Sequence, residues 1–213
     1  KKNKEGIVLS SPMYHSISQR LIFLSILLNS TLCIQSTFNK IKWIKIARDN
    51  LATFSILPSS LYSQVIPELI KSKNKDLKIS NIVSCCSPLD ERVKKLIKNA
   101  KIKKIKFFDT YGASEVGTVA NYNIKVDNFP HNFVGFITKG NNVSIDKKDS
   151  GKILCSSQQS QLSYFNYPKK KFYDLGDYGY LKGTKLFLSG RNVDKISISG
   201  GTIFLTDIEK TLE

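Results

Sequence analysis

The residues best suited to chemistry in this chain are found in the sequence YGASE that begins at Tyr111, and at Asp177 and Arg191. The Tyr111 ring can stack on a base, and the Ser114 hydroxyl can reach a phosphate. A carboxylate such as Glu115 can bind Mg²⁺. Asp177 can accept hydrogen bonds from two ribose hydroxyls, and the Arg191 guanidinium can contact the sugar or a phosphate. These residue types predict a nucleotide site.

The elements that position these residues alternate between strand and helix over residues 1–130. Residues 79–86 are apolar on both faces, which is typical of a buried parallel strand. The helix that follows is expected to have Ser87 as its N-cap, with Pro88 at the first helical position. Residues 105–109 then form a strand that leads into a turn at Tyr111 and Gly112. Repeated strand–helix–strand units indicate an α/β fold with a mostly parallel sheet and flanking helices.

The pattern changes after residue 130, where helical periodicity disappears. Short strands are expected at residues 143–146, 152–155, 178–181 and 185–189, with tight turns between them. From residue 191 onward, a hairpin around Gly200 and Gly201 precedes the start of a helix. We therefore expect three parts: an α/β subdomain at 1–130, a small antiparallel β subdomain at 131–190, and a hinge with the start of a C-terminal α+β lid domain at 191–213.

Composition and charge narrow the class of protein. The net charge is +16 and 41% of residues are hydrophobic, which fits a globular chain with a real core. The charge comes mostly from scattered lysines without interleaved aromatic residues, so no specific nucleic-acid binding is expected. The longest apolar run, residues 21–28, is too short to span a bilayer, and no signal-peptide layout appears. A cytoplasmic location is the resulting expectation.

The four cysteines do not have the spacing of a metal site. Cys85 and Cys86 are adjacent on an expected strand, where successive side chains point to opposite faces. We therefore expect these two thiols to be separated and to act as small buried groups in a reducing compartment.

Eight segments, taken in order, resemble the motifs of one family, the adenylate-forming superfamily of acyl-CoA synthetases, peptide-synthetase adenylation domains and firefly luciferase. The resemblance covers nearly the whole chain. The matching segments are 12–15 (PMYH), 84–89 (SCCSPL), 111–115 (YGASE), 151–153 (GKI), 164–168 (YFNYP), 173–179 (YDLGDYG), Gly190-Arg191 with Asp194 and Ile196, and Ile208-Glu209.

The resemblance implies a role for each matched residue. Glu115 and Ser114 would be catalytic, with Glu115 binding Mg²⁺ and Ser114 on the α-phosphate. The nucleotide would be bound by Tyr111, Gly112, Ser87, Asp177 and Arg191. The acyl substrate would lie near His15, Cys85, Cys86 and Ala113. Val193 and Asp194 would form the hinge, although Val193 stands where the family usually has Asp or Lys.

The resemblance also implies an activity: ATP-dependent activation of a fatty or other apolar carboxylic acid as acyl-AMP, then thioester formation on CoA or on the phosphopantetheine of an acyl carrier protein. Homodimer formation is left open. The family's phosphate loop and C-terminal lysine are not found in this sequence, so we favour an incomplete and inactive fragment of a longer ligase. A non-catalytic nucleotide-binding relic or scaffold is the alternative, and a basic nucleic-acid binder is a third hypothesis.

Overall fold

The computed structural model describes residues 5–71, 76–100, 102–126, 129–130, 132–146, 148–149, 151–191, 195–198, 201–205 and 208. The chain divides into two compact units. The first comprises residues 1–110 with 123–128, and the second comprises residues 111–122 with 129–213.

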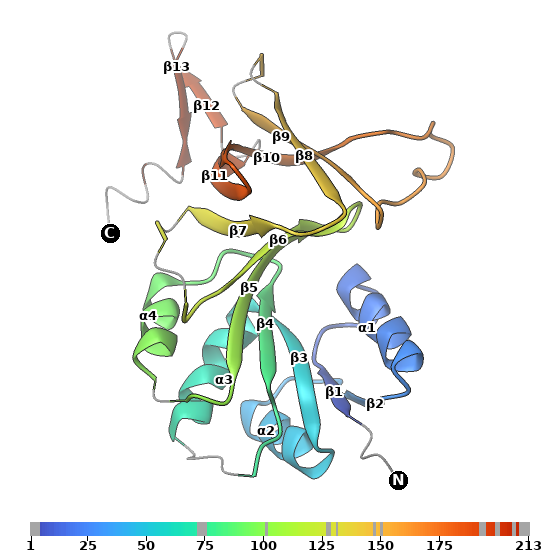
Figure 1. Cartoon of the computed structure of the whole chain (residues 1–213), viewed down its shortest axis with the longest axis vertical. Helices are drawn as coiled ribbons and strands as arrows, with labels where there is room; N and C mark the ends of the chain where they lie inside the picture. Colours follow the sequence, from blue (N-terminus) through green and yellow to red (C-terminus); the bar gives the residue numbers. More distant parts are fainter. Residues whose placement is uncertain are drawn as a thin grey trace. The chain divides into compact units, whose positions relative to one another are not determined.

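The first unit alternates strands and helices, as expected. Its elements are β1 (Gly6–Leu9), α1 (Ser16–Leu27), β2 (Thr31–Ile34), α2 (Lys40–Asp49), β3 (Ala52–Pro58), α3 (Ser59–Lys71), β4 (Asn81–Cys85), α4 (Glu91–Asn99) and β5 (Lys106–Ala113), whose last three residues belong to the second unit. The strands pair in parallel in the order β2-β1-β3-β4-β5. Figure 1 shows the four helices around these strands. The predicted α/β fold with a mostly parallel sheet is confirmed for this unit.

Helices α1 and α2 help to bury the first strand in the core of the first unit. All four residues of β1 are buried, and Val8 and Leu9 are fully shielded from solvent. Helices α1 and α2 both pack against β1, so the strand has a helix to cover it. Trp43 of α2 is fully buried as well.

The start of α4 differs from the prediction. The helix begins at Glu91, and its N-cap is Asp90, whose carboxylate accepts a hydrogen bond from the Arg92 backbone N–H at 2.7 Å. Ser87 is therefore not the cap, and Pro88 lies before the helix. An Asp side chain satisfies a free N–H of the first turn as well as a Ser does, and its charge also suits the positive end of the helix dipole.

The second unit is built from strands and loops (Figure 1). Its strands are β6 (Gly117–Asn123), β7 (Phe133–Ile137), β8 (Asn141–Asp146), β9 (Lys152–Ser157), β10 (Tyr173–Lys182) and β11 (Lys185–Arg191). They pair antiparallel in the order β6-β7-β11-β10-β9-β8. The predicted antiparallel β structure is confirmed, but β6 and β7 had not been predicted.

The second unit has its own apolar core and ends in a hairpin. Val116, Val119 and Ile153 are fully buried and form one cluster with Leu186. Strands β12 (Lys195–Ile198) and β13 (Gly201–Phe204) pair antiparallel, which confirms the expected hairpin.

Within the described ranges, no helix has the length and apolar character needed to cross a membrane. The expected domain boundaries at 130 and 190 remain predictions.

Candidate functional site

The segment around Tyr111 is part of a strand and not of a turn. Strand β5 runs through Tyr111 and Gly112 to Ala113, and the turn follows at residues 114–116. A Cβ on Gly112 would lie 2.1 Å from the backbone oxygen of Gly117, so the two backbones approach too closely for any side chain. Gly112 thus lets β5 and β6 meet directly, and it fixes where the turn falls.

Three predicted nucleotide-binding residues meet within the second unit. The Tyr111 hydroxyl donates a hydrogen bond to Asp177 Oδ2 at 2.7 Å, and Arg191 Nε lies 3.1 Å from Asp177 Oδ1. Asp177 and Arg191 are paired residues on β10 and β11, which places their side chains together. Tyr111 reaches them from β5. The structure therefore brings together residues that are 66 positions apart in the sequence.

Asp177 is the buried centre of this cluster, with only 5% of its surface exposed. Burial raises the pKa of the Asp177 carboxyl group, while the Tyr111 hydroxyl and the Arg191 guanidinium act in the opposite direction. Burial also raises the pKa of Tyr111, and the neighbouring Asp177 charge adds to this. The Arg191 side chain is 56% exposed. It is the member of the cluster with most freedom to reorient toward a ligand.

Glu115 is held at the turn by two contacts from a later loop. The Tyr164 hydroxyl donates a hydrogen bond to Glu115 Oε1, and the Gln161 backbone N–H donates to the Glu115 backbone oxygen at 2.8 Å. Hydrogen bonding to Glu115 raises the pKa of Tyr164. Ser114 is exposed next to Glu115.

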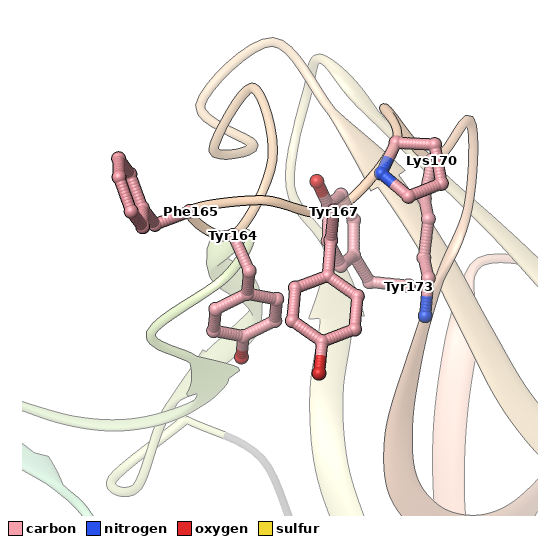
Figure 2. A pocket seen from close by; sticks show the side chains of 6 residues that line it. Tyr164, Phe165, Tyr167, Lys170 and Tyr173 are labelled. Atoms are coloured by element: carbon pink, nitrogen blue, oxygen red, sulfur yellow. The ribbon is translucent and has the colours of Figure 1, made fainter.

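An aromatic pocket lies in the loop between β9 and β10 and at the first residue of β10. It has a volume of about 550 Å³ and is lined by Tyr164, Phe165, Tyr167, Pro168, Lys170 and Tyr173. Figure 2 shows the hydroxyls of Tyr164 and Tyr167 pointing the same way, while the Phe165 ring turns outward. The sequence YFNYP had been matched only as a motif, and its concentration of aromatic residues was the signal for a pocket.

The predicted acyl-pocket residues His15, Cys85 and Cys86 lie in the first unit, and Ala113 lies in the second. His15 is exposed and is the N-cap residue of α1, without a side-chain capping bond. Its ring centroid is 4.6 Å from that of Tyr14. Ser87, predicted to bind the nucleotide, is hydrogen-bonded through its hydroxyl to Ser59.

The side chains of Cys85 and Cys86 do not lie where the sequence predicted. Strand β4 ends at Cys85, and Cys86 has a φ of 77°, so the alternation of side chains across a strand stops between them. Their Sγ atoms are 3.3 Å apart. The expectation that these side chains point apart, both as buried groups, was wrong: Cys85 is buried and Cys86 is exposed.

The hinge residues Val193 and Asp194 lie outside the described residues.

In the part of the chain that the structure describes, no group of three or more His, Cys, Asp or Glu side chains could hold a metal ion. An ion bound at Glu115 would need most of its ligands from elsewhere.

The sequence is similar to those of proteins named as ligases. No protein-family model matches it. It is 26% identical over 226 aligned positions to the "Putative long chain fatty acid-CoA ligase VraA" of Staphylococcus haemolyticus (strain JCSC1435), and 24% identical over 221 positions to the protein of the same name from Staphylococcus aureus (strain COL). Each match covers 99% of this chain and 46% of the relative, so the chain spans about half the length of these proteins.

Comparisons of structure agree on the fold. The o-succinylbenzoate coenzyme A synthetase (MenE) of Bacillus subtilis, in complex with ATP and magnesium, superposes with a TM-score of 0.83 at 16% identity, over 98% of this chain and 46% of that one. The amide bond synthetase McbA of Marinactinospora thermotolerans gives 0.83 at 14% identity, over 97% and 44%. The chain thus has the fold of these adenylate-forming enzymes, and its sequence relatives are named as acyl-CoA ligases.

Proposed function

We propose that the full-length protein activates a carboxylic acid with ATP, forming acyl-AMP and pyrophosphate, and then transfers the acyl group to the thiol of CoA. The observation that carries this proposal is the Tyr111–Asp177–Arg191 cluster, in a chain whose relatives are named as fatty acid-CoA ligases. The match to a synthetase crystallised with ATP and magnesium also supports it.

Asp177 is the residue proposed to bind the ribose. A carboxylate has about four lone-pair sites, and the contacts to Tyr111 and Arg191 use one on each oxygen. One acceptor site therefore remains on each oxygen for the two ribose hydroxyls. The Tyr111 hydroxyl holds the carboxylate in place while its ring is offered to the base, and Arg191 supplies positive charge to the sugar or phosphate.

Glu115 is the residue proposed to bind Mg²⁺. Magnesium is commonly held by one or two carboxylates together with substrate phosphates, so a single carboxylate beside a nucleotide fits this ion. When bound, the ion would neutralise charge on the phosphates. The Tyr164 hydroxyl contacts only Oε1 of Glu115, which leaves Oε2 for the metal.

The proposed substrate is a fatty or other apolar acid. The printed names of the relatives point to long chain fatty acids. No acidic residue lies among His15, Cys85, Cys86 and Ala113 to pair with the ammonium group of an amino acid. CoA is preferred over a carrier protein as the acceptor because the relatives are named as CoA ligases.

The test is ATP–pyrophosphate exchange by the full-length gene product over fatty acids of increasing chain length. Asp177→Ala and Glu115→Gln should each lower the exchange rate about hundredfold, since each removes a preorganised contact to the nucleotide or its metal. Asp174→Asn is the matched control, because this Asp lies on the same strand but contacts Lys152 at 3.5 Å and the Gly176 backbone N–H at 2.8 Å instead of the Tyr111–Asp177–Arg191 cluster. It should leave the rate unchanged.

Two results would contradict the proposed function in different ways. Exchange with no acid, together with AMP binding in calorimetry that Asp177→Ala abolishes, would overturn the ligase proposal in favour of a non-catalytic nucleotide-binding protein. Acyl transfer to the phosphopantetheine of a carrier protein and not to CoA would overturn the proposed acceptor alone.

A further inference from the structure

Two thiols of unlike surroundings lie side by side at the end of β4. Cys85, the last residue of the strand, is 7% exposed, and its Sγ is 3.6 Å from the backbone oxygen of Leu57. Cys86 is exposed, and the two Sγ atoms are 3.3 Å apart. The contact depends on the backbone, because a regular strand would direct the two side chains to opposite faces.

The backbone at Cys86 is held in a costly conformation. Its φ of 77° is in the region that favours glycine, and a residue with a Cβ is held there at a cost of about 1–3 kcal/mol. An exposed side chain adds little packing to offset that cost, so the strained residue points to a chemical use of its sulfur.

The two sulfurs differ in reactivity. The hydrogen bond from Cys85 lowers the pKa of Cys86 to about 7, while the same contact and burial raise the pKa of Cys85. A thiolate is the nucleophilic form of cysteine, so Cys86 is both accessible and partly ionised at neutral pH. Cys85 is then the neighbour within reach of any product formed on Cys86.

We propose that Cys85 and Cys86 are a redox modification site, in which a hydroperoxide converts the two thiols into a reversible disulfide between adjacent residues. The Cys86 sulfur attacks the peroxide oxygen, the O–O bond breaks, and an alcohol or water leaves after taking up a proton. The sulfenic acid formed on Cys86 is then attacked by the Cys85 sulfur, which loses its proton, and a second water leaves. Two thiols and one hydroperoxide thus give one disulfide, one alcohol (or water) and one water.

The spacing of adjacent residues makes this disulfide easy to reduce. Consecutive Cα atoms are about 3.8 Å apart, whereas disulfides usually join Cα atoms about 4.4–6.8 Å apart. The bond would therefore be strained, and strained disulfides are the labile ones. The other cysteines offer no such site, since Cys33 and Cys155 are buried and burial raises the pKa of both.

The modification does not depend on the proposed ligase activity. Its consequence for acid selection does rest on that function, because these two residues are proposed to lie at the acyl pocket. The test therefore reads the thiols themselves and uses no activity measurement.

The experiment treats the folded, reduced chain with hydrogen peroxide, blocks free thiols with iodoacetamide, and digests with trypsin. Cleavage after Lys78 and Arg92 releases residues 79–92, which contain both cysteines, as one peptide. The expected result is a peptide that has lost two hydrogen atoms and carries no alkyl group. Reduction with dithiothreitol before blocking should restore two alkyl groups.

Two variants separate the roles of the sulfurs. Cys86→Ser changes an exposed residue and should abolish the loss of two hydrogens. Cys85→Ser should let dimedone trap a sulfenic acid on Cys86 that is not trapped in the unmodified chain. Since Cys85 is buried, circular dichroism checks that this variant folds, and Cys86→Ser keeps the test decisive if it does not. Two alkylated thiols after peroxide, a sulfinic acid on Cys86, or a disulfide between two chains would overturn the proposal.

Discussion

The turns that follow the neighbouring parallel strands β4 and β5 are constrained in different ways. Near the end of β5, just before its turn, Gly112 is required because a Cβ would lie 2.1 Å from the backbone oxygen of Gly117. After β4, Cys86 adopts a φ of 77°, which glycine would adopt more easily. The first constraint is steric and admits no side chain, whereas the second is conformational and admits a side chain at a cost in free energy. A fold can therefore place a side chain at a position of the second kind but not at a position of the first kind.

The largest effect is expected from Gly112→Ala. The added methyl group meets backbone atoms that cannot move independently, so the β5–β6 junction must open, and we expect a loss of about 3 kcal/mol or more in the free energy of unfolding. Chemical denaturation followed by circular dichroism measures this loss.

Gly176→Ala is the matched control for that change. Gly176 has a φ of 73°, and nothing lies within 4 Å of its ideal Cβ position. Its substitution should cost only about 1 kcal/mol, from conformation alone. Equal losses in the two variants would contradict the distinction between steric and conformational turns.

The next largest effect is the pH dependence of Cys86 alkylation. A pKa of about 7 means that the thiolate fraction rises as the pH increases through neutrality. The rate of reaction with iodoacetamide should therefore rise about tenfold between about pH 6 and about pH 8 and then level off. Peptide mass spectrometry resolves this cysteine from Cys155, whose pKa is raised to about 11 by burial and which should remain unreacted. A midpoint above about pH 8.5, as in a free cysteine, would remove the chemical difference between the two turns.

The sequence predicted the parallel strands well and the turns less well. The run of residues 79–86 predicted a buried parallel strand, and β4, which pairs in parallel with β3 and β5 and packs against α3, lies within it. Strands β6 and β7 were missed because their pairing is set by partners distant in sequence.

In the candidate site, the residues could be predicted from the sequence, but most of their contacts could not. Asp177 and Arg191 could be identified from their motifs, and pairing of β10 with β11 brings them together. The Tyr111 contact to Asp177 could not be foreseen, because a side-chain hydrogen bond across 66 positions depends on tertiary structure. The closeness of the Cys85 and Cys86 sulfurs was mispredicted since the strand was assumed to continue through Cys86, and one positive φ angle reverses that conclusion.

A smaller effect is expected from Cys86→Gly. Glycine relieves a strain of about 1–3 kcal/mol but adds about 0.5–1 kcal/mol of chain entropy to the unfolded state. The net result should be a stabilisation of about 1 kcal/mol, measured by urea denaturation under reducing conditions. Cys86→Ala keeps the strained backbone and should give no gain. A loss of stability on Cys86→Gly would mean that the sulfur itself stabilises the β4 turn.

The smallest effect is expected from Tyr164→Phe, which removes the hydroxyl that donates to Glu115 at the β5 turn. Tyr164 is 50% exposed, so water can replace the lost partner, and the free energy of unfolding should fall by about 0.5 kcal/mol. A double-mutant cycle with Glu115→Ala isolates the pair, and its coupling energy should be equally small. A coupling above about 2 kcal/mol would mean that side-chain contacts stabilise the β5 turn as much as the close backbone approach at Gly112 does. The steric account of that turn would then be incomplete. A small coupling would instead leave the Glu115 carboxylate free to exchange Tyr164 for another ligand at little cost, as a residue proposed to bind a metal ion requires.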